Sequence, residues 1–402
     1  MLNKHIYNYF LILFSVIPIS IIIGPSVSLS NIILIDISFL ALIIYQKNYK
    51  FLGNRTLKYF LFLYLYLIFN SLISIDLSLG IYRNFGFIRI IIFFIALNYF
   101  FNEKNFLNKV LIFWLSIISI VILDIYLEVL TGSGTIEKEH FFGGKGGQRV
   151  VSFFKDEPIV GGYIFGFYLI IIGCLLDRFD DKYKIYIFLF AIIFLIAIFI
   201  TGERSNAIRS ILAFALFLIF YKGIGFKLKI GFLISTFLII LIIIFSSNFL
   251  KLRFINQLNF IIKSENIYFM LYNSGYQVFK NNKIFGVGNK NYRIETCENQ
   301  NKTNYVCSTH SHQVYFDLLS EHGLVGFFII FFIMYKLIFS KIKKTLSSSN
   351  YLQIGTLIYL ITTFLPMLPS GAFFSDYVLT IFILNLGIFY ATGSKTNIFK
   401  KI

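Results

Sequence analysis

The sequence predicts an all-α, polytopic membrane protein. Its composition is 57% hydrophobic and 19% aromatic, and its mean hydropathy is +0.78, which is far more apolar than a soluble domain. Apolar runs also recur along the whole chain, and crossing the ~30 Å hydrocarbon layer takes roughly 20 mostly apolar residues. By this measure we expect about 12 transmembrane helices, with a large outward loop before the tenth.

The predicted spans follow one another with mostly short connections. They lie near residues 8–24, 29–45, 59–76, 85–101, 110–128, 159–176, 185–201, 207–222, 230–247, 313–335, 351–368 and 372–391. The first run follows Lys4 and His5 and has no small-residue cleavage pattern. We therefore expect it to be the first helix and not a cleaved signal peptide.

The distribution of lysine predicts the orientation. The formal charge of +17 would suit a nucleic-acid partner, but the lysines concentrate in short loops between spans, and we expect no nucleic acid. These loops lie near residues 47–58, 104–109, 178–184, 222–229 and 341–344. The positive-inside rule makes them cytoplasmic, together with both termini. The outward segments are then about 130–158, 202–206, 248–312 and 366–375.

Three regions follow from this orientation. Residues 1–247 hold the first nine helices with an outward loop at 130–158, residues 248–312 form the large outward loop, and residues 313–402 hold the last three helices and a basic tail. The first half of the large loop, 250–279, has apolar residues at mixed helical spacing, which favours amphipathic helices on the membrane surface.

The arginines are distributed differently from the lysines. Of nine arginines, only two lie in the predicted cytoplasmic loops, and the others lie outside or near the outer end of a span: Arg83, Arg89, Arg149, Arg204, Arg209, Arg253 and Arg293. A guanidinium group binds phosphate or carboxylate in a bidentate fashion. We infer an outward-facing anionic site, against the alternative that some of these residues contact lipid headgroups.

Two stretches place arginine at a predicted helix end. Arg89 lies one to two turns inside the fourth span, where a charge either marks function or reaches the outer interface along its own side chain. The short hairpin 201–206 puts Arg204 and Arg209 at the outer surface beside the start of a helix, whose free amides also favour anions. A purely structural hairpin remains the alternative.

The glycine-rich segment 131–149 is expected to be a mobile outward loop.

The three cysteines have different expected roles. Cys174 lies in an apolar span and is expected to be a small packing residue. Cys297 and Cys307 share the large outward loop, where an oxidising compartment favours a disulfide. Metal ligation with the nearby histidines is the rival interpretation, but the spacing fits no zinc pattern.

A polar stretch meets the tenth span, and three of the five histidines lie within it: His310, His312 and His322. If the helix begins near Ser311, His312 stands in its first turn. The positive end of the helix and nearby arginines then keep the imidazole neutral, so that it can act as a general base. Asp317 is about 140° further round the helix and is a poor candidate for orienting it.

The same stretch resembles a known family. His312-Gln313, followed after nine residues by Gly323-Leu-Val-Gly326, is similar to the motif of the O-antigen ligase and polymerase superfamily, in which His and then Asn, Ser or Gln precede such a glycine pair. The segments Thr201–Ser205 and Ile284–Gly288 and the twelve-helix plan are similar too.

The resemblance implies glycan transfer on the periplasmic side of the bacterial inner membrane. The donor would be a glycan on undecaprenyl pyrophosphate, and the acceptor a hydroxyl of lipid A core, of another lipid-linked repeat or of a protein. It implies His312 as the base and Arg204 as a pyrophosphate contact, without a metal or other cofactor. Arg89, Arg209 and Arg293 are added as pyrophosphate contacts from their location alone.

A transporter of anionic glycolipids is the competing function from another class. It would require charges near the bilayer midplane and broken helices there, whereas the predicted charges lie at the outer end of the spans. Accumulation of the lipid-linked donor on the outer leaflet of a deletion strain would favour the enzyme, and accumulation on the inner leaflet would favour the transporter.

Overall fold

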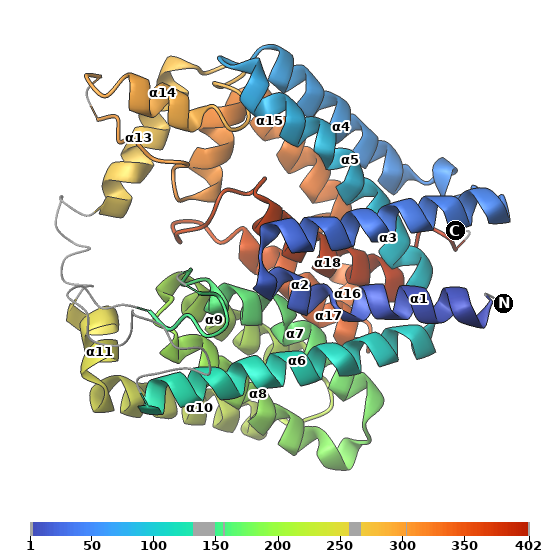
Figure 1. Ribbon diagram of the computed structural model, residues 1–402. Coiled ribbons are helices and arrows are strands. Elements are labelled where there is room, and N and C mark those ends of the chain that lie inside the picture. The colour runs from blue at the N-terminus through green and yellow to red at the C-terminus, as the bar shows by residue number, and fades with distance from the viewer. Residues whose placement is uncertain (1–2, 132–148, 156, 257–266, 303, 401–402) are drawn as a thin grey trace.

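The protein is described by a computed structural model that covers residues 3–131, 149–155, 157–256, 267–302 and 304–400. Within these ranges the chain is helical, without a strand, as the sequence predicts (Figure 1). Most of the glycine-rich segment and part of the large predicted loop lie outside the described residues, so the expectation of a mobile loop there is not addressed.

The helices follow the predicted spans closely in position. The first part of the chain forms α1 (Lys4–Ser15), α2 (Ile17–Ile23), α3 (Pro25–Gln46), α4 (Arg55–Leu72), α5 (Leu77–Phe100), α6 (Lys104–Thr131), α7 (Val160–Arg178), α8 (Lys184–Ile200), α9 (Arg204–Phe220) and α10 (Phe226–Ser246). The second part forms α11 (Asn248–Lys251), a π-helical turn (Leu252–Asn256), α13 (Ile267–Asn281), α14 (Tyr292–Glu298), α15 (Val314–Leu337), α16 (Ile342–Leu346), α17 (Tyr351–Thr363) and α18 (Asp376–Thr392).

The number of spans differs from the prediction. By length and composition, seven helices among the described residues can cross a membrane, or eight if the bent pair α1 and α2 counts as one span. All 12 predicted segments contain a helix, but α17 and α18 have only 13 and 17 residues. The count of 12 is therefore not confirmed. The chain between α17 and α18 instead forms an irregular loop, which lines the cavity described below.

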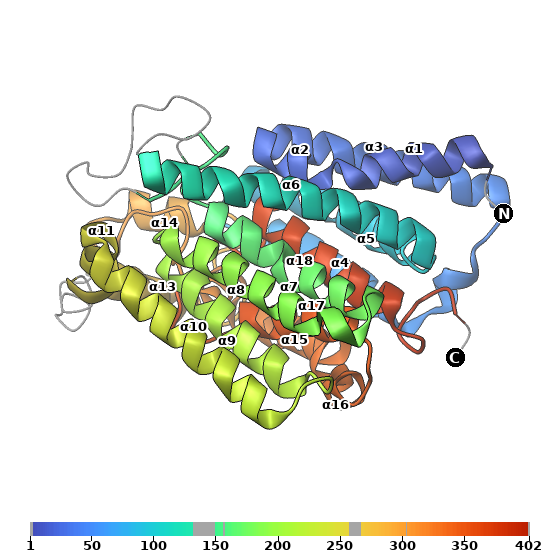
Figure 2. The same cartoon turned by 90° about the horizontal axis from the view of Figure 1, so that it is seen from below.

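The centre of the bundle is the helix pair α7 and α17. Of the apolar window of α7, 83% is buried, and α17 packs along it (Figure 2). Two glycines permit this close packing: a Cβ on Gly173 would stand 2.6 Å from Leu352 Cα, and one on Gly355 would stand 2.5 Å from Leu169 O. Small residues at such crossings let two backbones approach within a membrane.

Helix α15 is broken where the glycine motif lies. Gly323 has a φ of +61°, and a Cβ there would meet the backbone of Ile284. The backbone amides of Leu324 and Val325 donate to Lys283 O and Ile284 O at 2.8 and 3.1 Å. The loop that contains Ile284–Gly288 thus accepts the hydrogen bonds that the break in the helix leaves without helical partners. Gly326 lies against Tyr66 of α4, whereas Gly323 lies against this loop.

Both chain ends lie at one end of the bundle, and the cap formed by α13 and α14 lies at the other (Figures 1 and 2). We call the latter the capped end. The break in α15, the loop between α17 and α18 and the turn between α8 and α9 all gather there. The functional residues predicted from sequence are therefore to be sought at the capped end.

Candidate active site

A cavity of about 840 Å³ opens at the capped end, and five cationic side chains line it. Its charged and imidazole side chains are Arg149, Glu203, Arg204, Arg209, Arg253, Lys290, His310 and His312, and its aromatic side chains include Tyr268, Tyr272, Tyr359 and Tyr377. Of the described residues that line the cavity, only Glu203 carries a carboxylate. The cavity thus combines net positive charge with two imidazoles, which suits an anionic ligand.

The turn between α8 and α9 places the first two arginines. Glu203 does not face them as a counter-ion but caps the neighbouring helix α7: its carboxylate accepts from the amides of Gly161 and Gly162 at 2.6 and 3.1 Å. Asn206 Nδ2 also donates to it at 2.7 Å. Among the described residues no ion pair joins Glu203 to Arg204 or Arg209, so both guanidinium groups remain available to a ligand in the cavity.

Arg209 is 7% exposed and is held in a fixed orientation. Its Nη2 donates to Pro369 O at 3.0 Å, and its Nη1 lies 3.5 Å from Asn206 Oδ1. Among the described residues, the buried atoms Arg209 Nε and Arg204 Nη1 have no hydrogen-bond partner. Buried guanidinium nitrogens are costly to leave without an acceptor, so these atoms favour an anionic ligand in the cavity.

Arg253 approaches the same turn from the π-helical segment. Its Nη2 donates to Gly202 O at 3.1 Å, and Gly202 has a φ of +76°, which brings this carbonyl toward the arginine. Burial, together with the charges of Arg149 and Arg204, lowers the pKa of Arg253 to about 10. The three guanidinium groups therefore repel one another, and a bound polyanion would relieve that repulsion.

The two histidines of the segment 310–312 lie side by side at the cavity wall. Their ring centroids are 4.0 Å apart and the rings are inclined by 35°. Thr309 Oγ1 lies 2.9 Å from His310 Nδ1, and His310 Nε2 is buried without a partner. The backbone is fixed from the other side, because Ser370 N donates to His312 O at 2.9 Å.

The helix begins later than expected. Helix α15 begins at Val314, and His312 has a left-handed backbone with a φ of +58°. Gln313 is the N-cap, and its Oε1 accepts from Tyr315 N and Phe316 N at 2.8 and 3.1 Å. Gln313, the residue that follows the histidine in the motif, thus acts as a helix cap. His312 precedes this cap, lies outside the helix and lines the cavity.

Burial and charge favour the neutral form of both imidazoles. Burial and then Arg149 lower the pKa of His312, and burial together with His312 and Lys290 lowers the pKa of His310 to about 4. The direction is the one expected from the sequence. The main cause is loss of hydration, however, and not the end of the helix. Neutral imidazole can accept a proton.

The third histidine lies elsewhere. His322 is fully buried within α15, where its Nδ1 lies 3.4 Å from the hydroxyl of Tyr66. Asp317, which sequence reasoning rejected as the partner of His312, accepts from Phe373 N at 3.3 Å and holds the loop between α17 and α18. No hydrogen bond that we observe joins Asp317 to His312, so its role here is to position that loop.

The remaining two arginines proposed as pyrophosphate contacts lie outside this cavity. Arg89 pairs with Asp376 at the start of α18, and Asp376 also receives Arg83 Nη2 at 2.9 Å. Arg293 is exposed on α14 and is not among the residues that line the cavity. Of the four arginines proposed from sequence, the cavity therefore brings Arg204 and Arg209 together with His312.

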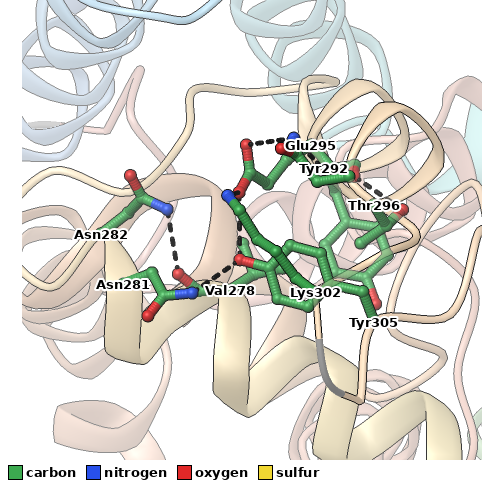
Figure 3. Close-up of polar contacts among 9 residues, drawn as sticks. Val278, Asn281, Asn282, Tyr292, Glu295, Thr296, Lys302 and Tyr305 are labelled. Atoms are coloured by element: carbon green, nitrogen blue, oxygen red, sulfur yellow. Dashed lines mark hydrogen bonds and ion pairs between the residues drawn. The ribbon is translucent and has the colours of Figure 1, made fainter.

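The predicted disulfide is present. Cys297 and Cys307 are bonded and close a turn at the capped end. Inside this turn Glu295 accepts from Lys302 Nζ and the hydroxyl of Tyr305 at 2.9 and 3.0 Å, and Asn281 Nδ2 donates to the same hydroxyl (Figure 3). The turn leads directly into the histidine segment. Among the described residues no cluster of three or more metal-binding side chains occurs.

Sequence reasoning missed several lining residues. Arg149 and Arg253 were placed on the outer side but not in the site, and Lys290, His310 and Tyr377 were given no role. The arginine distribution was a usable signal for the first two. For Lys290 there was none, because its location depends on the loop that fills the break in α15, where its amide donates to Glu321 Oε1 at 2.9 Å.

Residues 189–331 match the family model described as O-Antigen ligase. The predicted resemblance to the O-antigen ligase superfamily is thereby confirmed. The matched segment runs from α8 to the second half of α15 and contains the turn 201–205, Arg253 and the histidine motif. It supports glycan transfer of the O-antigen ligase type at the level of the family, by a membrane protein acting on lipid-linked glycan. A comparison with curated proteins found no match.

Proposed function

We propose that the protein transfers a glycan from undecaprenyl pyrophosphate to a hydroxyl acceptor on the periplasmic side of the inner membrane, with inversion at the sugar carbon and without a metal. The supporting observation is that His312 shares one cavity with Arg149, Arg204, Arg209 and Arg253. Such an arrangement combines a base with a site for a doubly charged leaving group.

The arginines would act on the donor. As the bond between the sugar and the pyrophosphate breaks, negative charge develops on the leaving oxygen, and fixed guanidinium donors stabilise it. Arg204 and Arg209 keep buried nitrogens free of protein acceptors, so both are assigned to the pyrophosphate. Arg89 and Arg293 are given no part in this step, because neither lines the cavity.

His312 would act on the acceptor. Its neutral imidazole removes the hydroxyl proton while the acceptor oxygen forms a bond to the anomeric carbon, and undecaprenyl pyrophosphate leaves with the electron pair of the broken bond. A single displacement of this kind inverts the anomeric configuration. His310, whose ring lies beside that of His312, would cover the base on one side. Its own pKa is also lowered, so it adds no positive charge next to the base.

The acceptor assigned to this proposal is lipid A core, which makes the reaction an O-antigen ligation. Transfer to another lipid-linked repeat, as in a polymerase, or to a protein hydroxyl would use the same scaffold. The decisive experiment is reconstitution of the purified protein in proteoliposomes with a defined lipid-linked donor and each of the three acceptors in turn.

The expected result is transfer to lipid A core with inversion, and its loss in the His312→Ala variant. Insertion of the variant is checked by its elution as a monodisperse species and by its unchanged thermal transition. Wild-type protein that consumes no donor with any acceptor would refute the function, and a His312→Ala variant with undiminished transfer would refute the base.

A further inference from the structure

A second cavity, of about 370 Å³, lies beside the first on the side of the helices α2 and α3. It is lined by the end of α2, the first turns of α3, the loop before α7 and the start of α18. Its volume is within the roughly 300–1,000 Å³ range of small-molecule sites. The reaction proposed above uses two substrates, and the first cavity has been assigned the donor and the base His312 but not the body of the acceptor.

The two cavities share one partition. Ile159 and Tyr377 line both of them, and the hydroxyl of Tyr377 donates to Ile159 O at 3.2 Å. A ligand in the second cavity is therefore separated from the first cavity by the tyrosine ring and one peptide group. No other residue in the described part of the chain lines both cavities.

The charges of the two cavities differ. The second cavity has two cations, Arg89 and Lys155, and two carboxylates, Glu157 and Asp376. Arg89 is already paired with Asp376. A balanced set of guanidinium and carboxylate groups does not select a polyanion, but it offers donors and acceptors together, which is what the hydroxyl groups of a sugar require.

The rim of the second cavity is apolar. Ile21, Ile22 and Ile23 of α2 line it, and the side chain of Ile23 is 55% exposed. The helices α1 and α2 are the bent pair that together are long and apolar enough to cross a membrane. The rim therefore stands where lipid chains would cover it, and a ligand that enters there is anchored in the membrane.

We infer that this second cavity receives the sugar end of a membrane-anchored acceptor, whose reacting hydroxyl passes the partition formed by Tyr377 and Ile159 to reach His312 and the donor in the first cavity. The inference rests on the proposed function and deepens it. It assigns Arg89 and Asp376 to the acceptor sugar, and it leaves the pyrophosphate to the first cavity.

The test fills the second cavity. Ser28 lines it from α3, whereas Ser30, two residues further on, is exposed and does not. Ser28→Trp is expected to raise the apparent KM for a lipid-anchored acceptor at least tenfold, and Ser30→Trp is expected to change it less than twofold. Binding of undecaprenyl pyrophosphate alone should be equal in both variants, which also shows that each is folded. Thr380→Met, which fills the cavity from α18, repeats the test from the opposite wall.

The outcomes separate the inference from the function on which it rests. Wild-type transfer together with an unchanged acceptor KM in both Ser28→Trp and Thr380→Met overturns the inference and leaves the function standing. Wild-type protein that neither binds undecaprenyl pyrophosphate nor transfers a glycan overturns both. A water-soluble saccharide acceptor should have at least a tenfold higher KM than the same saccharide on a lipid anchor, and equal values would overturn the membrane-anchored assignment.

Discussion

The histidines at 312 and 322 belong to one short stretch, yet their surroundings are opposite. His312 precedes the N-cap of α15, has a left-handed backbone and lines a cavity with several guanidinium groups. His322 lies inside the helix just before its break, is fully buried and faces the hydroxyl of Tyr66. The same side chain is thus presented to a ligand in one place and to the protein in the other.

The difference teaches that the helix cap and the helix break have separate roles. Gln313 stops the helix so that His312 faces the cavity, whereas Gly323 breaks the helix so that the loop 283–288 can dock. One feature exposes a chemical group, and the other fixes the scaffold beneath it. Substitutions at the two positions should therefore fail in different ways.

The largest expected effect on glycan transfer comes from substitution of His312, which lines the cavity. His312→Ala should lower the rate of glycan transfer by roughly 10²-fold to 10⁴-fold, which is the usual contribution of a general base. His322→Phe is the matched control: it should lower the thermal transition through loss of the contact with Tyr66, while transfer in the folded fraction stays within about twofold. Equal losses of transfer in both variants would contradict the distinction drawn here.

Substitutions of the arginines should also differ in their effect on transfer, according to whether the residue lines the cavity. Arg204→Gln or Arg209→Gln should reduce the rate of transfer by about 10²-fold to 10³-fold, because each removes a fixed donor to the leaving group. Arg293→Gln, which changes an exposed arginine away from the cavity, should leave the rate nearly unchanged. Steady-state transfer at saturating acceptor measures all three variants, and a large loss in Arg293→Gln would restore that residue to the donor site.

The pH profile tests the surroundings of His312. Burial and Arg149 lower its pKa, so the base stays unprotonated to lower pH than an ordinary histidine, whose pKa is about 6.5. The acid limb of kcat/KM should therefore fall below pH 6.5, and Arg149→Gln should move it upward. A limb at or above pH 6.5 in the wild-type protein would mean that the catalytic base is solvated or is another group.

Removal of the disulfide should affect the scaffold more than the chemistry. Cys297→Ser with Cys307→Ser releases a turn in which the two cysteines are 10 residues apart, and the expected loss of stability is about 2–4 kcal/mol. Transfer should fall only moderately, because Ser370 and the contacts of α13 still hold the histidine segment. Thermal unfolding with and without reductant measures the first effect, and a complete loss of transfer at a temperature where the variant is folded would contradict the second.

The smallest effect is expected from chelation. The proposed transfer uses guanidinium groups in place of a metal, so EDTA should leave the rate within experimental error. The assay is repeated after dialysis with added Mg²⁺ or Mn²⁺. A rate restored by either ion after chelation would show that a metal participates and would require a different account of how the leaving group is stabilised.

Much of the helical scaffold could be predicted from the sequence. Apolar runs of sufficient length locate the helices, because hydrocarbon leaves the backbone no alternative to internal hydrogen bonds, although α5 begins eight residues before its predicted start at residue 85. The cysteine pair and the arginines at 204 and 209 were found from location and side-chain chemistry. The predicted number of 12 spans is not confirmed. Hydropathy does not reveal that the chain after α17 leaves the helix and forms the cavity wall.

What the sequence by itself determined is the inventory: apolar helices, an excess of arginine in the segments predicted to lie outward, two cysteines in one predicted loop and a histidine motif that resembles that of the O-antigen ligase superfamily. Only the tertiary structure decided which of these groups meet. Arg89 and Arg209 look equivalent along the chain, yet Asp376 holds one while the other lines the cavity of His312. The physical reason is that contacts between helices depend on backbone breaks and close approaches at particular residues, such as Gly323 and Gly355, whose consequences are not local in sequence.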